Sequence, residues 1–314
     1  MVYRDRTSLL TAIGVLLLLV GISAALLGPL EMYCFYLFSE GGRFHYDGFG
    51  FGSFMFGYIA AQIIGYYLIA LLLIPLGYGH LRARRWARTL AVALLWSWLV
   101  VGIPLMVAFL FVLLSAKDLS PAVALIVVVL LGLSYAVAPW LLIRFYRGRD
   151  VRRTFEARDP NSYWIEGLGM PVLVTSCLSI LYVVALHVPI FFNGLFPFFG
   201  TWLSGLEGIL ALDISMVCLV CLIWGMLRQR TWAWWGSLVY FGLLTVTSMA
   251  TALKSSYSEI LSNMNFPSFE VEMLQGIPLQ GYHFAALIGV PLIITLCVVV
   301  LSKRHFSTWK TPRG

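Results

Sequence analysis

Eight long apolar stretches, separated by short polar segments, dominate the pattern of this chain. Each approaches or exceeds the roughly 18–20 residues with which an α-helix crosses about 30 Å of hydrocarbon. Their apolar residues run on continuously, whereas the strands of a membrane barrel alternate apolar and polar positions. The pattern therefore predicts an all-α integral membrane protein with eight transmembrane helices. The stretches are Leu9–Leu30, Phe56–Leu76, Leu90–Leu114, Val123–Ile143, Met170–Phe192, Leu206–Met226, Trp234–Leu253 and Phe284–Leu301.

Basic residues fall almost entirely on one side of these predicted helices. Of the 21 Lys and Arg residues, all but Arg43, Lys117 and Lys254 lie on the side that carries both termini. Because cytosolic loops carry the excess of Lys and Arg in membrane proteins, both termini are predicted to be cytosolic. We expect the protein in the plasma (inner) membrane of a bacterial-type cell.

The first apolar stretch also has the features of a secretory signal peptide. Arg4 and Arg6 precede it, and the small residues Ser23–Ala25 offer a cleavage site. Cleavage would leave an odd number of helices and conflict with the alternation of charge between the loops. We therefore interpret this stretch as a retained transmembrane helix.

The amino-acid composition limits the kinds of molecule that this protein is expected to contact. Hydrophobic residues make up 61% of the chain and charged residues 11%, so too few polar residues are available to cover a soluble domain. The net charge of +7 is explained by the basic loops and their attraction to anionic headgroups. The expected partners are the lipid bilayer and, as a further candidate, other membrane subunits. Nucleic acid is not expected.

A nine-residue motif occurs twice in the chain. Residues 79–87 read GHLRARRWA and residues 225–233, 146 positions later, read GMLRQRTWA, so six of nine positions match. Both copies fall in a predicted cytosolic turn, after the second and the sixth apolar stretch. Four helices return the chain to its starting side, so the copies would be related by an axis along the membrane normal. The motif predicts two parallel four-helix repeats, residues 1–160 and 161–314.

The same motif places basic and indole side chains at the level of the lipid headgroups. A cationic side chain near the membrane surface contributes about 1 kcal/mol of attraction to anionic lipid, and indole rings prefer the interface. We interpret the motif chiefly as a topology anchor, with docking of a cytosolic partner or a lipid headgroup as the alternative. The candidate anchors are Arg82, Arg84, Trp86, Arg228, Arg230 and Trp232.

Asp213 is an acidic residue well inside a predicted span. A carboxylate in hydrocarbon costs a few kcal/mol, so such residues usually face the bundle interior and find a partner. His187 lies near the outer end of the preceding helix, at a similar depth. Asp213 is therefore predicted to face inward, within hydrogen-bonding or water-bridged reach of His187 or of a Tyr or Ser hydroxyl. The pair Asp213 and His187 is therefore the candidate intramembrane polar site. It is either hydrogen-bonded contact between helices or an ion or proton site.

The outer segment Lys254–His283 mixes apolar and acidic residues, which predicts a short helix on the outer surface. It would cover the bundle or act as a lid or docking surface.

Catalytic, cofactor and metal sites are not expected. No G-x-S-x-G, H-E-x-x-H, P-loop or dinucleotide-binding pattern occurs in a suitable context. Cys218 and Cys221 form a C-x-x-C without two further ligands nearby, so they are interpreted as packing residues. The leading hypothesis is a non-catalytic accessory or complex-forming membrane subunit. The alternative is a transporter of a small solute or ion with Asp213 at its site.

Overall fold

The computed structural model describes residues 4–46, 50, 52–114, 120–277 and 279–306, and it is an all-α membrane protein. Within these residues, eight helical segments are long and apolar enough to cross a membrane, which confirms the eight predicted spans. Two of them are not a single regular α-helix, because the fourth contains a π-helical turn and the fifth ends in a 3-10 turn that includes Pro189. The spans are α1 (Thr7–Phe38), α2 (Phe54–Leu81), α3 (Arg85–Leu114), the succession of α4 (Pro121–Gly132), η1 (Leu133–Val137) and α5 (Ala138–Arg147), then α7 (Met170–Ala185) followed by η3 (Val188–Phe191), α8 (Gly205–Leu227), α9 (Thr231–Lys254) and α12 (Gly281–Ser302).

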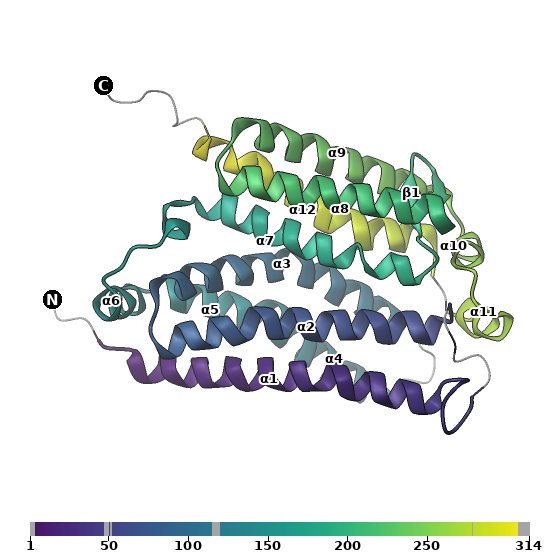
Figure 1. The fold of residues 1–314 in the computed structure, drawn as a ribbon, viewed down its shortest axis with the longest axis horizontal. Coiled ribbons are helices and arrows are strands. Elements are labelled where there is room, and N and C mark those ends of the chain that lie inside the picture. The colour runs from purple at the N-terminus through teal and green to yellow at the C-terminus, as the bar shows by residue number, and fades with distance from the viewer. Residues whose placement is uncertain (1–3, 47–49, 51, 115–119, 278, 307–314) are drawn as a thin grey trace.

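Shorter elements lie at the two ends of the bundle (Figure 1). One end, called here the basic end, carries the α2–α3 and α8–α9 turns, α6 (Arg149–Arg158), η2 (Trp164–Gly167) and η4 (Lys303–His305). The other, called the capped end, carries the antiparallel hairpin of β1 (Phe196–Phe198) and β2 (Thr201–Leu203), with α10 (Tyr257–Met264) and α11 (Ser268–Gln275). The first residues of α1 and the last residues of α12 lie at the basic end.

The outer segment after α9 forms two short helices where the sequence predicted one. The buried carboxylate of Glu270 on α11 accepts a hydrogen bond from the amide of Phe54, at 2.7 Å. This amide belongs to the first turn of α2, whose donors have no partner within the helix. The segment therefore packs against the first turn of α2, and its role as a cover, a lid or a docking surface stays a prediction.

A seam of glycines brings α1 and α2 together. Gly14, Gly21 and Gly28 recur every seven residues and are buried against α2. A Cβ added at Gly21 would lie 2.8 Å from a side-chain carbon of Ile74, and one at Gly14 would lie 3.0 Å from the carbonyl oxygen of Gly77. Small residues at this spacing let two membrane helices approach closely.

Each half of the chain has its own core, and a third cluster joins the two. In the first half, buried residues of α1, α2, α3, α5 and α6 pack together, and in the second half those of α7, α8, α9 and α12 do so. The joining cluster consists of Ala93 and Val100 on α3 with Leu173, Val174 and Leu178 on α7. Helix α3 also contacts α12, so it forms the main contact of the first half with the second.

The α2–α3 turn ends α2 in a compact hydrogen-bonded form. The amide of Arg84 donates to the carbonyl of Gly79 at 2.7 Å, and that of Ala83 donates to His80 at 3.0 Å. Ala83 is in the left-handed region, with φ of 46°. These features define a Schellman motif, which usually places glycine at that position. A Cβ on Gly79 would lie 2.5 Å from the Cβ of Ala87, so glycine is required for α3 to pack this closely.

The α8–α9 turn repeats this geometry at the matching positions of the second motif. The amide of Arg230 donates to Gly225 at 2.9 Å, and that of Gln229, with φ of 53°, donates to Met226 at 2.9 Å. A Cβ on Gly225 would again lie 2.5 Å from that of Ala233. The two motifs therefore form the same turn. The relation between the whole halves, 1–160 and 161–314, stays a prediction.

Candidate functional site

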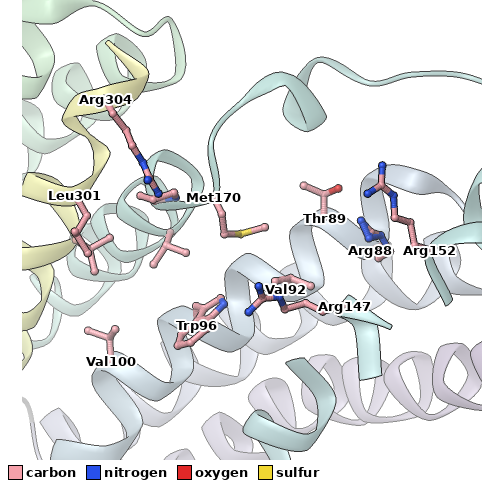
Figure 2. Close-up of a pocket in the computed structure, with 13 residues that line it drawn as sticks. Arg88, Thr89, Val92, Trp96, Val100, Arg147, Arg152, Met170, Leu301 and Arg304 are labelled. Carbon is pink, nitrogen blue, oxygen red and sulfur yellow. The ribbon is translucent and has the colours of Figure 1, made fainter. Parts of the chain in front are cut away.

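A pocket of about 600 Å³ lies at the basic end, between the two halves. We call it the four-arginine pocket, because Arg88 of α3, Arg147 of α5, Arg152 of α6 and Arg304 of η4 line it. Figure 2 shows Arg304 across the pocket from Arg88 and Arg152, with Met170 between them. The helical geometry explains the convergence, because α3 and α7 begin at this end while α5 and α12 finish there.

Positive charge dominates the mouth of the four-arginine pocket. Among the described residues that line it, none is acidic. Arg152 forms an ion pair with Glu156, at 2.8 Å, outside the lining. The hydrogen bond from Arg152 and the charge of Arg88 hold the pKa of the Glu156 carboxyl below its ordinary value, against partial desolvation. Arg88 and Arg147 have no hydrogen-bond or ion-pair partner in the described part of the chain, so their guanidinium groups remain available to an anion.

The deeper wall of the four-arginine pocket is apolar. Val92, Trp96 and Val100 of α3 face it, together with side chains of α7 and α12. Arg88 and Val100 are twelve residues apart on one helix, which corresponds to about 18 Å at 1.5 Å per residue. That length is close to half of a hydrocarbon core of about 30 Å. The pocket thus combines a cationic mouth with an apolar wall as deep as one membrane leaflet.

Two acidic residues of the segment between the halves fix the start of α3. The Asp159 carboxylate is 0% exposed, lies 3.4 Å from Arg84 Nη1 and accepts from the Arg85 amide at 3.3 Å. Burial alone would raise the pKa of Asp159, but hydrogen bonds from Tyr163 and from the Arg85 amide outweigh it and lower the pKa. Glu166 binds the Arg85 side chain at 2.5 Å. These contacts hold the mouth of the pocket in place.

The predicted anchors all belong to the two turns at the basic end. Arg84 is partly taken up by its ion pair with Asp159, whereas Arg82 and Arg230 are exposed. Arg228 lies over the Trp224 ring at 5.6 Å. Trp232 is exposed, and Trp86 is half-buried against Gly79. Their contact with lipid headgroups stays a prediction.

The predicted pairing of Asp213 with His187 is wrong. α7 ends at Ala185, ahead of Pro189, so His187 lies beyond the helix, and its Nδ1 is 2.8 Å from the carbonyl oxygen of Val183. Both side chains are exposed. Asp213 has no hydrogen-bond or ion-pair partner among the described residues, and it points outward instead of into the bundle.

Sequence reasoning did not single out the four pocket arginines. They come from four separate elements, so no local pattern joins them. One signal lay directly after the repeated motif, because Arg88 follows the first copy at the position where Trp234 follows the second. An arginine that replaces an aromatic residue one turn inside a span marks a local change of environment.

No protein-family model matches this chain, and comparison with curated proteins and with solved structures gives no match either.

Proposed function

We propose that this multi-pass membrane protein is a non-catalytic binder of an anionic lipid, whose headgroup phosphate occupies the four-arginine pocket. The basic end faces the cytosol of a plasma (inner) membrane, as the asymmetry of charge predicts. The observation that carries the proposal is the convergence of four guanidinium groups above an apolar wall. Guanidinium groups bind phosphate through paired hydrogen bonds, and basic pockets between transmembrane helices bind anionic headgroups.

The helix termini add to this attraction. α3 and α7 begin at the pocket, and helix N-termini carry a partial positive charge that favours anions. The acyl chains of the lipid would lie along Val92, Trp96 and Val100. A soluble phosphate compound would leave this apolar wall unused, so an amphiphile fits better.

The binding of phosphatidic acid to the purified protein in neutral detergent tests the proposal. We expect Arg88→Gln with Arg147→Gln to weaken binding at least tenfold, because two unpaired guanidinium groups are removed. Arg82→Gln with Arg228→Gln is the matched control, since it removes equal charge from exposed positions at the same end. Equal losses in the two double variants would refute a defined pocket and leave only diffuse surface charge. Inorganic phosphate should compete weakly.

A second candidate function, a complex-forming subunit, is favoured by the exposed face of α8. Asp213 is exposed among Leu210, Ile214 and Val217, about 12 Å from the start of the helix at Gly205. An ionisable side chain that faces hydrocarbon is costly, so a neighbouring subunit with a donor at this depth would stabilise it. Asp213→Leu should then dissociate a complex isolated from native membranes, while the chain itself stays folded. The transporter hypothesis loses support, because Asp213 lines neither of the two main cavities.

A further inference from the structure

A second cavity, of about 380 Å³, lies at the capped end of the bundle. Helices α3, α7, α9 and α12 contribute to its wall, and the β1–β2 hairpin and α10 contribute from the capped end. We call it the outer cavity. It shares no lining residue with the four-arginine pocket, although α3, α7 and α12 contribute to both.

Three side chains with N–H or O–H groups line the outer cavity, and two of them are satisfied. The Tyr182 hydroxyl is 2.9 Å from Oγ1 of Thr295, and the Trp202 indole donates to Ser255 at 2.7 Å. The Ser248 hydroxyl has no partner among the described residues, although the residue is only 2% exposed. The lining of the outer cavity therefore includes one residue, Ser248, whose hydrogen-bonding group is unused.

Ser248 differs in this respect from its neighbours on α9. Thr245 donates to the carbonyl of Phe241 at 2.6 Å, and Thr247 donates to Pro197 at 3.1 Å. Serine in a helix commonly bonds the carbonyl four residues earlier. A buried hydroxyl without a hydrogen bond costs about 1–3 kcal/mol. The unpaired Ser248 hydroxyl therefore destabilises the protein unless a bound molecule forms a hydrogen bond with it.

Water is a poor occupant of this space. A buried water molecule needs two to four polar partners, and apolar cavities without them stay dry. Here Ser248 is the one described lining group left unsatisfied, and the surrounding wall consists mainly of side chains such as Leu105, Leu186 and Leu212. We propose that the outer cavity binds a slender, largely apolar molecule with one carbonyl or hydroxyl oxygen, which hydrogen-bonds to Ser248.

The surroundings favour entry from the bilayer and not from water. Leu105, in the lining on α3, is 46% exposed within the membrane-spanning region. At the capped end the hairpin is held to α9, because the amides of Phe199 and Gly200 donate to Thr247 and Thr251 at 2.7 and 2.9 Å. The ligand is thus a membrane-soluble molecule.

Brominated probes test the proposal in the full-length protein, reconstituted in phosphatidylcholine vesicles. The probes are ω-bromodecanol, which has a hydroxyl, and bromodecane, which has none; bromine quenches a tryptophan that it contacts. Trp202 lines the outer cavity, so the difference in quenching between the wild type and Trp202→Phe isolates this site. We expect Ser248→Ala to weaken bromodecanol binding about three- to tenfold, as expected for one hydrogen bond, and to leave bromodecane binding unchanged.

A filling variant tests the cavity itself. Ala185 lies in the lining and is exposed, so Ala185→Phe should abolish Trp202 quenching by both probes. Ala138→Phe, at an exposed position outside the cavity, is the matched control and should have no effect. Unchanged quenching in Ala185→Phe, or equal losses of the two probes in Ser248→Ala, would overturn the proposal. If Ala185→Phe does not fold, the comparison of probes in Ser248→Ala decides alone.

In the cell, the oxygen that hydrogen-bonds to Ser248 can belong to the ester group of a membrane phospholipid or to a free apolar alcohol or ketone. Vesicles of ether-linked phosphatidylcholine, which lack the ester carbonyl, separate these sources. Tighter bromodecanol binding in ether-linked than in ester-linked vesicles would identify the phospholipid as the natural occupant. Equal binding would identify a free apolar molecule. The result is independent of phosphatidic acid binding at the four-arginine pocket, so either proposal can fail alone.

Discussion

The α2–α3 and α8–α9 turns have the same backbone but differ in what lies beside them. In the second half, Trp234 is 5% exposed, and its indole donates to the carbonyl of Val299 at 2.8 Å. In the first half, the matching position holds Arg88, which lines the four-arginine pocket. The α8–α9 turn is therefore followed by a buried indole, whereas the α2–α3 turn is followed by an arginine that lines a pocket. The two halves thus share the backbone of the turn, and they differ in the residue that follows it, which is buried in the core in one half and lines a pocket in the other.

The largest loss of stability is expected when the buried tryptophan after the α8–α9 turn is removed. Trp234→Ala should destabilise the protein by about 3–5 kcal/mol, because it leaves a large cavity in the second core. Trp86→Ala, at a half-buried position of the other copy two residues before the one that matches Trp234, should cost clearly less. Chemical unfolding in mixed micelles measures both variants. Equal losses would show that the two halves do not differ in packing here.

The reverse change places a tryptophan after the α2–α3 turn. Arg88→Trp should fill part of the four-arginine pocket and weaken phosphatidic acid binding at least tenfold, which corresponds to about 1.4 kcal/mol, with the fold preserved. Arg82→Trp, at an exposed site of the same turn, serves as the control. If Arg88→Trp still binds phosphatidic acid as the wild type does, the lipid does not bind in the four-arginine pocket.

The glycines should respond alike in the two turns. A Cβ at Gly79 or at Gly225 meets the facing alanine at 2.5 Å, so Gly79→Ala and Gly225→Ala should each cost about 1–3 kcal/mol through overpacking. Thermal melting in detergent measures both. A neutral result at one site only would mean that the two turns are not equivalent.

Acid should weaken the first turn more than the second. The pKa of Asp159 is lowered in the folded protein, so its contribution to stability is fully present above the ordinary value of 3.8 and is lost as the pH falls through the lower folded value. Melting curves below pH 5 should therefore show a smaller acid dependence in Asp159→Asn than in the wild type. An unchanged dependence would contradict a role for this carboxylate at the turn.

The smallest effect is expected at the left-handed positions. Gln229→Gly should stabilise the protein by about 0.5–1 kcal/mol, because glycine relieves the steric cost of positive φ. Ala83→Gly should gain less, because Ala83 is 5% exposed and the variant also loses a buried methyl group. Melting temperatures of the two single variants measure these effects. A loss of stability in Gln229→Gly would contradict the motif.

The eight spans were predictable because hydrophobic length is a property of continuous sequence. The repeated turn was also visible, since its glycine and tryptophan positions lie within nine residues. The four-arginine pocket was not, because Arg88 and Arg304 come to face the same pocket only through the packing of α3 against α12. The pairing of Asp213 with His187 failed for a related reason: it assumed a continuous helix, whereas α7 ends at Ala185. Length and local motifs are therefore readable from this sequence, and contacts between distant helices are not.

The glycine seam between α1 and α2 has a consequence for biogenesis. These two helices leave the ribosome before α3, and their close contact through Gly14 and Gly21 uses partners on α1 and α2 alone. A hairpin of this kind can enter the lipid as one unit and pack before α3 is synthesised. The later helices then assemble against a surface that already exists, so a bulky residue at Gly21 should impair insertion of the nascent chain before it affects any ligand.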